Sequence, residues 1–407
     1  MTEVMEGIRI LEVAEHTFVP AASAVLSDWG ADVIKIEHVE RGDAMRGLAR
    51  TGVMDLGNKV HALLEHSNRG KRSLALDLTT TEGLEILYKL AAISDVFLTN
   101  KLPKVQEKLA IGADVIKSHN PDIIYVSGTG FGPKGPDANA GGYDVLGYWS
   151  RSGLSLGGTP LGSDRLQGMP APAYGDSIGA MTIAGGISAA LLHRERTGEA
   201  VTVDVSLLGT GMWSFGAGIA LSAQLGTPWR PPAAGTPSTL QNPLARSYQT
   251  EDGWLTLACL QGFHYWPEVC RVLDRPELIE DERFSTEQAL KENAPAAAEI
   301  LEQIFATATL DEWRTRLRDF QGQWAPVLDS IEVAKDEQAL ANGYIIESET
   351  AEGVTFPLVA TPVQFNGSPS QTRRAPEFNE HGDAILETEV GLDWEQIVEL
   401  KLKGVVA

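Results

Sequence analysis

The chain has 407 residues, 43% hydrophobic and 22% charged, which is long enough for two globular domains with ample cores. The formal net charge of −22 argues against a broad surface for nucleic acid or anionic membranes, although a local basic cluster could still hold a phosphate. No stretch approaches the ~20 apolar residues of a membrane helix, no signal peptide precedes the first strand, and the two cysteines fit no zinc motif. These features predict a cytoplasmic protein with no metal site.

The start of the chain predicts a parallel α/β sheet. Residues 8–13 and 32–37 have the apolar pattern of strands, and a run of small and apolar residues between them ends at Gly30, as a helix does. A β-α-β unit of this length is typical of a parallel sheet between helices. The alternation continues with predicted strands at 73–78, 95–99 and 123–127, and a helix at 80–92.

Two irregular regions divide the rest of the chain. Residues 128–170 are rich in Gly, Pro, Ser and Asp, and a loop of this length is more often functional than idle. A long helix from Ser177 to about Arg196 and a strand at 201–205 follow it. A second break lies at 225–240. We therefore predict a large domain over residues 1–224, a smaller domain with its linker over 225–324, and a segment over 325–407 that returns to the large domain.

Asp176 is the first candidate for a reactive group. It follows Gly175 and stands where the long helix is expected to begin. Taken alone, this pattern is better explained as an N-cap, whose carboxylate accepts backbone N–H bonds. The same N–H groups and the helix dipole would keep the carboxylate ionised, and a glycine beside it would leave the approach open. Such a carboxylate can act as a nucleophile.

A second candidate is the basic cluster around Gly70, formed by Arg69, Lys71 and Arg72 just before a predicted strand. A solvated turn and a phosphate-binding turn explain this cluster about equally well. A weaker basic group follows the strand that ends at Thr99, and ligands of α/β proteins bind at the C-terminal ends of strands. This group contains Lys101, Lys104 and Lys108.

Other common motifs are weak or missing. Residues 128–132 look like a dinucleotide-binding loop, but the spacing is wrong, and Pro133 and Pro136 prevent a helix from starting there. The eight histidines are scattered without a metal-binding pair, and the sequence has no Gly-x-Ser-x-Gly element of a serine hydrolase. Trp149, Trp213 and Trp266 are interpreted as core or lining residues.

Short motifs recur in a fixed order along nearly the whole chain. They are residues 11–13 with Pro20, 30–37, 42–43, 68–73, 95–96 with Asn100, 120–121, 130–132 with 135–136, 142–144, 175–176, 189–191 with 196–198, and 373–376 with 380–381. Each motif is weak alone, but their order and spacing are specific. In this arrangement the sequence resembles the class III (CaiB/BaiF) CoA-transferases, which include formyl-CoA:oxalate and carnitine CoA-transferases and the related α-methylacyl-CoA racemases.

The resemblance implies a fold and a set of functional residues. The fold is α/β, with a large Rossmann-like, CoA-binding domain built on a parallel sheet, a smaller α+β domain, and two chains interlocked as rings in a homodimer. Asp176 matches the catalytic aspartate of the family. The positions on or near CoA contacts are Thr17, Phe18, His38, Arg69, Lys71, Arg72, Asn100, Lys101 and Lys108, with Tyr143 and Asp144 on the loop beside the nucleophile.

The resemblance also implies a reaction between an acyl-CoA and a carboxylic acid, without ATP, metal or a permanently bound cofactor. Asp176 attacks the thioester to give a mixed anhydride, and the released CoA thiolate then attacks the aspartyl carbonyl to give an aspartyl-CoA thioester. The acceptor carboxylate attacks in turn, and CoA returns to the acyl group. We expect backbone N–H groups near Gly142 to stabilise the oxyanions, and water to be excluded because both intermediates can hydrolyse.

Two other functions remain open. The racemases of the family carry a histidine where this chain has Tyr143, and Asp176 alone does not easily perform a two-base proton exchange, so an epimerase is the second choice. A non-catalytic protein that binds acyl-CoA is the third, and the retained Gly175-Asp176 pair argues against it.

Further positions bear on the ligands. His38 stands where an arginine that holds CoA is common, and Lys101 where an aromatic residue is common, so the adenine contact is left open. The glycine-rich lid of the formyl-CoA type is reduced here to residues 233–236, which disfavours oxalate as the acceptor. Trp149 and Trp213, on the segments expected to shape the acyl pocket, favour a bulky or apolar acyl group.

Overall fold

The computed structural model describes residues 3–51, 60–233, 241–369 and 372–407, with the side chains of residues 49–51 excepted. The chain divides into two compact units. The larger unit combines residues 1–233 with residues 338–407, and the smaller unit covers residues 234–337. Each unit is described by itself.

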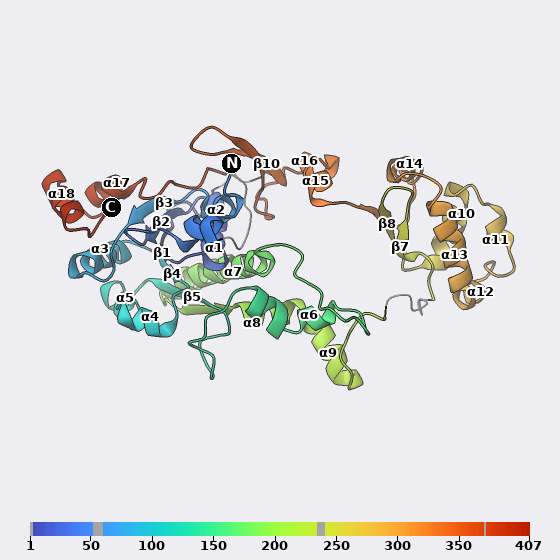
Figure 1. Ribbon diagram of the computed structural model, residues 1–407, viewed down its shortest axis with the longest axis horizontal. Coiled ribbons are helices and arrows are strands. Elements are labelled where there is room, and N and C mark those ends of the chain that lie inside the picture. Colours follow the sequence, from blue (N-terminus) through green and yellow to red (C-terminus); the bar gives the residue numbers. More distant parts are fainter. Residues whose placement is uncertain (1–2, 52–59, 234–240, 370–371) are drawn as a thin grey trace. The chain divides into compact units, whose positions relative to one another are not determined.

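The larger unit is built on a six-stranded sheet in the order β3-β2-β1-β4-β5-β6, and all its strand pairs are parallel (Figure 1). This confirms the predicted α/β class with a parallel sheet. The chain moves outward from β1 to β3, returns to pair β4 beside β1, and then moves to the other edge, so a switch point lies between β1 and β4. The strands are β1 (Arg9–Val13), β2 (Asp32–Glu37), β3 (Arg72–Ala75), β4 (Val96–Thr99), β5 (Ile124–Thr129) and β6 (Thr202–Ser206).

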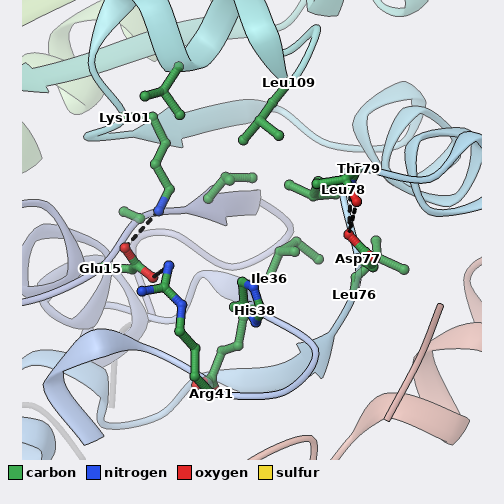
Figure 2. A pocket seen from close by; sticks show the side chains of 14 residues that line it. Glu15, Ile36, His38, Arg41, Leu76, Asp77, Leu78, Thr79, Lys101 and Leu109 are labelled. Atoms are coloured by element: carbon green, nitrogen blue, oxygen red, sulfur yellow. Dashed lines mark hydrogen bonds and ion pairs between the residues drawn. The ribbon is translucent and has the colours of Figure 1, made fainter. Parts of the chain in front are cut away.

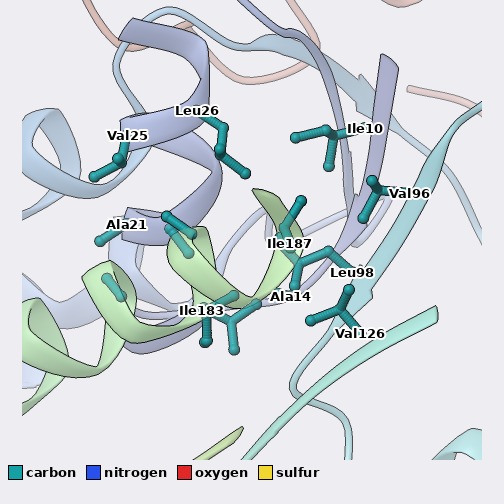
Figure 3. Packing of buried hydrophobic residues seen from close by; sticks show 14 of the residues in the cluster. Ile10, Ala14, Ala21, Val25, Leu26, Val96, Leu98, Val126, Ile183 and Ile187 are labelled. Carbon is teal, nitrogen blue, oxygen red and sulfur yellow. The ribbon is translucent and has the colours of Figure 1, made fainter. Parts of the chain in front are cut away.

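Helices cover both faces of the sheet. On one face, Leu26 of α1 (Phe18–Asp28) and Ile183 of α7 (Tyr174–Thr197) pack against strand side chains such as Ile10 (Figure 3). Burying an aliphatic side chain of this size contributes about 1.5–3 kcal/mol. The helices on the other face are α3 (Thr81–Ala92), α5 (Ala113–His119), α17 (Gly382–Thr388) and α18 (Trp394–Leu402). The two C-terminal helices bring the end of the chain back to the sheet.

Helix α7 is long and apolar enough to cross a membrane by length and composition, contrary to the expectation that no stretch approaches this limit. Its buried side chains, among them Ile183 and Ile187, belong to the core between α1 and the sheet. Core helices of soluble proteins pass the same test, so this property is weak evidence for a membrane span.

The predicted ends of several elements agree with the structure for the expected physical reasons. Gly30 follows α1 with a φ of +103°, a conformation that favours glycine, and Thr80 caps α3 by accepting a hydrogen bond from the Gly83 N–H at 3.1 Å. The region 128–170 is less irregular than predicted. It contains a π-helical segment, η2 (Val145–Arg151), and a short helix, α6 (Leu154–Gly157).

The remaining elements of the larger unit connect or flank these layers. They are η1 (Ala44–Thr51), α2 (Ala62–Asn68), α4 (Pro103–Lys108), α8 (Leu207–Ser214), α9 (Gly216–Leu225), the hairpin of β10 (Ile345–Glu349) and β11 (Thr355–Val359), and α16 (Glu337–Ala341), which begins at the boundary of the units.

The smaller unit has its own core around a three-stranded antiparallel sheet. Trp266 and Trp313 are fully buried in this core. The strands lie in the order β7 (Ala245–Gln249), β8 (Trp254–Ala258) and β9 (Trp324–Val327). The helices are α10 (Gly262–Val272), α11 (Glu277–Glu280), α12 (Glu287–Glu292), α13 (Ala294–Phe305), α14 (Leu310–Arg316) and α15 (Ser330–Val333).

Candidate active site

The C-terminal ends of β1 and β4 form the floor of the candidate site. The Thr99 hydroxyl donates to the Val13 carbonyl at 2.8 Å, which joins the two strand ends. Directly after them, the Asn100 side chain donates to the Glu15 carbonyl at 2.6 Å and accepts from the Glu15 N–H at 3.2 Å. The predicted ligand residue Asn100 therefore fixes the backbone of the turn that follows β1, at the switch point where α/β sheets bind ligands.

A cavity of about 450 Å³ lies at this edge and brings together residues that are far apart in the sequence. Five of the predicted site residues line it, namely Phe18, Asn100, Lys101, Tyr143 and Asp176. Thr17 and Asp144 are buried and are not among its lining residues. The polar and aromatic lining residues are Glu15, His16, Phe18, Arg41, Asn100, Lys101, Tyr143 and Asp176.

A smaller cavity of about 160 Å³ lies beside the first and shares Glu15, Arg41 and Lys101 with it (Figure 2). The Glu15 carboxylate accepts from Lys101 Nζ at 2.8 Å and from Arg41 at 3.2 Å, so one acidic residue engages both cations. His38 lines this smaller cavity together with apolar side chains such as Leu76. The shared residues make the two cavities neighbouring parts of one ligand-binding edge.

Close backbone approach holds the loop that carries Tyr143 against the end of β5. A Cβ on Gly130 would lie 2.7 Å from the Cα of Gly142, and a Cβ on Gly142 would lie 2.9 Å from the Cα of Gly130. Both distances are shorter than real Cβ contacts, so both positions require glycine for this packing. Gly142 is thereby placed in the lining of the larger cavity.

Asp176 lies in the first turn of α7, and the predicted N-cap is wrong. The helix begins at Tyr174 after Ala173, whose φ of +58° is left-handed and whose own side chain makes no capping hydrogen bond. The neighbouring glycine also has another role than the open approach that we predicted. A Cβ on Gly175 would lie 2.4 Å from the ring of Tyr148, so the glycine makes room for this buried ring.

The electrostatic environment of Asp176 also differs from the prediction of a stabilised, ionised carboxylate. Burial and, as a smaller cause, the negative charge of Asp144 together raise the pKa of Asp176 to about 8. Asp144 is itself buried, and its pKa is raised by burial although the Val145 N–H donates to its Oδ1 at 2.8 Å. The two acidic groups therefore oppose each other's ionisation at the edge of the cavity.

The basic cluster does not form a phosphate-binding turn, which corrects the prediction for Lys71. Its ammonium group is completely buried, donates to the Glu12 carboxylate at 2.7 Å, and also donates to Asn68 at 3.0 Å. The Glu12 carboxylate also pairs with a second ammonium group, that of Lys35, at 2.7 Å. A ligand phosphate cannot reach an ammonium group that is enclosed in this way.

The other two cations of the cluster are also engaged by protein carboxylates. Arg69 is buried and pairs with Asp28 at 2.8 Å. Arg72 pairs with Asp32 at 2.6 Å, and Asp32 is the first residue of β2, so this guanidinium lies at the opposite end of the strands from the cavities. Lys108 is exposed at the end of α4 and lines neither cavity.

His16 is a site residue that the sequence analysis passed over as one of several scattered histidines. It follows the end of β1, and its ring contacts the Tyr143 ring edge to face at 5.5 Å between centroids. Its position directly after an apolar strand of a parallel sheet was the available signal, because ligands bind at such strand ends.

Within the described residues, no group of three or more His, Cys, Asp and Glu side chains is arranged to hold a metal. Of the predicted lid at residues 233–236, only Ala233 is described, and residues 234–236 lie outside the described part of the chain.

Comparison with known proteins agrees with this fold. The family model of CoA-transferase family III matches residues 5–382. The chain is 30% identical to an (R)-2-hydroxy-4-methylpentanoate CoA-transferase of Clostridioides difficile over 99% of both chains, and 30% identical to a cinnamoyl-CoA:phenyllactate CoA-transferase of Clostridium sporogenes over 98% and 96% of the two chains.

A crystal structure of a CAIB/BAIF family protein from Brucella suis superposes with a TM-score of 0.79 at 29% identity, covering 95% of this chain and 99% of that chain. Sequence and structure thus match relatives of the same family over nearly their whole length. The chain belongs to CoA-transferase family III and is a transferase that uses CoA thioesters as substrates.

Proposed function

We propose that this transferase moves CoA from an acyl-CoA donor to a carboxylic acid, with Asp176 as the residue that is covalently acylated. The observation that carries the proposal is the position of Asp176. This residue lies in the first turn of α7 and lines the larger cavity at the ligand-binding edge of the sheet. Carboxylate side chains of Asp and Glu form covalent intermediates in several classes of enzyme.

In the proposed mechanism, one oxygen of the Asp176 carboxylate attacks the thioester carbonyl, and the C–S bond breaks to release CoA thiolate. The thiolate attacks the aspartyl carbonyl of the mixed anhydride and expels the donor carboxylate. The acceptor carboxylate attacks the aspartyl thioester, and the C–S bond breaks to give a second anhydride and CoA thiolate. This thiolate then attacks the acceptor acyl carbonyl and expels the Asp176 carboxylate. Each step exchanges one carboxylate or thiolate for another, so the thioester free energy is conserved.

The environment of Asp176 favours this exchange. Its ionised form is disfavoured by burial and by Asp144, since both raise its pKa. Acylation converts the charged carboxylate into a neutral anhydride or thioester, which relieves the desolvation cost and the repulsion between the two acidic groups. The Gly142 backbone in the same cavity is the proposed source of an oxyanion contact.

We place the nucleotide end of CoA at the smaller cavity and its thioester in the larger one. His38 and Lys101 line the smaller cavity and supply polar contacts, while Leu76 offers an apolar surface to a base. Lys101 and Arg41 line both cavities, so a ligand that spans them passes both cations. Phe18 and Leu207 give the larger cavity apolar walls, which fit a compact apolar acyl chain.

We propose a homodimer as the working form, with the two chains interlocked. The supporting observation is the exposed apolar surface of α8 and the segment that follows it, where the side chain of Trp213 is 87% exposed. Exposed aromatic groups of this size commonly mark protein interfaces.

The covalent step is tested by intact-protein mass spectrometry after incubation with acyl-CoAs and trapping with hydroxylamine. We expect an adduct or hydroxamate at Asp176 in the wild type and none in Asp176→Ala. Asp164→Ala, which removes an exposed carboxylate of the same loop region, is the matched control and keeps the adduct. If turnover occurs without any trapped adduct and solvent deuterium enters the acyl α-carbon, the proposed CoA transfer is wrong and the protein is an epimerase.

A further inference from the structure

The larger cavity contains a polar side chain that the proposed transfer does not use. His16 lines this cavity with Asp176. The exchange of carboxylates and thiolate requires no general acid or base, because each nucleophile and each leaving group is already an anion. In the part of the chain that the structure describes, no hydrogen bond joins either ring nitrogen of His16 to another protein group. Both nitrogens therefore remain available to a ligand.

The backbone holds the His16 ring in a demanding position. Its φ of +69° is left-handed, which costs a residue other than glycine on the order of 1–3 kcal/mol. Two contacts compensate for this conformation. The His16 N–H donates to Asp43 Oδ1 at 2.9 Å. The Asn100 side chain makes hydrogen bonds with both the N–H and the carbonyl of the preceding residue, Glu15. Backbone strain of this kind is concentrated at functional sites.

The Asp43 carboxylate, which accepts the His16 N–H, is itself held by other groups. Asp43 is buried, pairs with the buried Lys35 at 2.7 Å, and also accepts the Met45 N–H at 2.8 Å. On the other side, the His16 ring contacts Tyr143 edge to face. The hydrogen bond to the His16 backbone and the contact with the Tyr143 ring thus fix the imidazole before a ligand binds. Such preorganisation is required of a side chain that recognises one particular group.

The charges around the cavity restrict what this imidazole can recognise. Glu15 and Asp176 line the cavity, and Asp144 lies next to Asp176. The two cations of the lining, Arg41 and Lys101, are both paired with Glu15. A second carboxylate on the acyl chain would be repelled by these acidic side chains, and both cations of the lining are already paired with Glu15. A neutral hydrogen-bonding group would not be repelled in this way.

We propose that His16 recognises a hydroxyl group close to the carboxyl end of the acyl chain, so that the enzyme acts on hydroxy acids in preference to their deoxy analogues or to dicarboxylic acids. This inference rests on the proposed placement of the thioester in the larger cavity. A hydroxyl donates one hydrogen bond and accepts others, and a neutral imidazole supplies one acceptor and one donor. A site built to bind a hydroxyl discriminates against the analogue that lacks it, because its own polar group is then left unpaired.

The test uses unreactive thioether analogues of CoA esters. Two of them carry a branched five-carbon-chain acid with and without a 2-hydroxyl, and a third carries a dicarboxylic acid. Binding is measured by calorimetry on wild type, His16→Gly and His16→Asn. Glycine removes the imidazole and accepts the left-handed backbone without strain, and asparagine tolerates this conformation and keeps a donor and an acceptor. CoA transfer to the two free acids is measured in parallel.

We expect the wild type to bind the hydroxylated analogue roughly tenfold more tightly than the deoxy analogue, as one neutral hydrogen bond allows. His16→Gly should bind the hydroxylated and the deoxy analogue with similar affinity, and His16→Asn should regain part of the preference. A preference that survives in His16→Gly, or tighter wild-type binding of a dicarboxylic analogue, would overturn the inference. Because the analogues cannot react, binding tests His16 even if no acid accepts CoA, which would instead refute the proposed function.

Discussion

At the scale of single residues, the pair of Asp144 and Asp176 controls when the nucleophile is ionised. The pKa of Asp176 is raised to about 8 by burial and by the charge of Asp144, and only the ionised form attacks a thioester. The rate of acylation should therefore rise with pH up to about this value. In Asp144→Asn one cause of the shift is gone, so the rise should move to lower pH, and each unit of pKa multiplies the ionised fraction in the acid range roughly tenfold.

The measurement is the initial rate of hydroxamate trapping between pH 5 and pH 9 (roughly the range that brackets the shifted group). Asparagine can still accept the Val145 N–H, so the local turn is preserved. Asp164→Asn removes an exposed charge nearby and should leave the profile unchanged. An unchanged profile in Asp144→Asn would mean that burial alone sets the ionisation of Asp176.

The same shift predicts that Asp176 lowers the stability of the fold. A carboxyl whose pKa is higher in the folded than in the unfolded state makes stability fall as pH rises between the two values, here from 3.8 to about 8. Asp176→Asn removes this ionisation. We expect its Tm to exceed that of the wild type by roughly 2–4 °C at pH 8, if the gain is about 1 kcal/mol. The two proteins should have similar Tm values near pH 4, and a difference that does not depend on pH would contradict this explanation.

At the scale of secondary-structure elements, a buried ionic network joins the strands beneath the site. Glu12 of β1 accepts Lys35 of β2 and Lys71 of the turn before β3, and the hydroxyl of Ser23 on α1 also donates to it. Glu12→Gln keeps the side-chain size but leaves Lys71 without a carboxylate. Breaking a buried pair in this way costs about 3–5 kcal/mol.

We expect urea unfolding to show this loss at acidic pH and a smaller loss at neutral and alkaline pH. Burial lowers the pKa of Lys71 to about 7 in the wild type, and Glu12 is one of the groups that raise it. Without Glu12 this pKa falls further, so the variant releases the uncompensated proton as the pH rises towards neutral. Glu287→Gln breaks the exposed pair with Lys291 and is the control, with a cost under about 0.5 kcal/mol. A loss in Glu12→Gln no larger than in the control would show that the network does not stabilise the fold.

The network also shows why the sequence predicted the strands better than the site. Local alternation of apolar residues placed β2 at residues 32–37, and a glycine after α1 marked the end of that helix. The same local reasoning left the role of Lys71 open between a solvated and a phosphate-binding turn, because its partner Glu12 is distant in the sequence and only the paired strands bring them together. It also misjudged Asp176, since the left-handed Ala173 that starts α7 three residues earlier has no sequence signal of its own.

The resemblance to the family added to what local patterns indicate. Local patterns already made Asp176 a candidate, and the resemblance matched it to the catalytic aspartate and singled out Tyr143, which the structure places in the same cavity. It did not single out His16, because that inference depends on the backbone conformation after β1 and on a cavity that the chain forms only when folded.

At the scale of the whole molecule, the proposed interlocked dimer makes a kinetic prediction. Two threaded chains cannot separate unless at least one of them opens or unfolds, whereas two chains that lie side by side separate whenever their interface breaks. Subunit exchange between tagged and untagged protein should therefore be limited by unfolding, on the order of hours or longer. The exposed side chains of α8 and α9, including Met212, Trp213 and Leu225, are the proposed contact surface.

Exchange is measured by mixing the two forms and recovering mixed dimers through the tag. Native mixing should give almost none within a working day, and mixing in urea before refolding should give the statistical proportion. Trp213→Asp places a charge on the proposed surface and should lower the yield of dimer on refolding, while Leu402→Asp, at a side chain that is 84% exposed on α18, should not. Rapid exchange of native protein would exclude threading but keep a dimer. A wild type that sediments as a monomer would remove the dimer itself, and the exposed Trp213 would then need another partner.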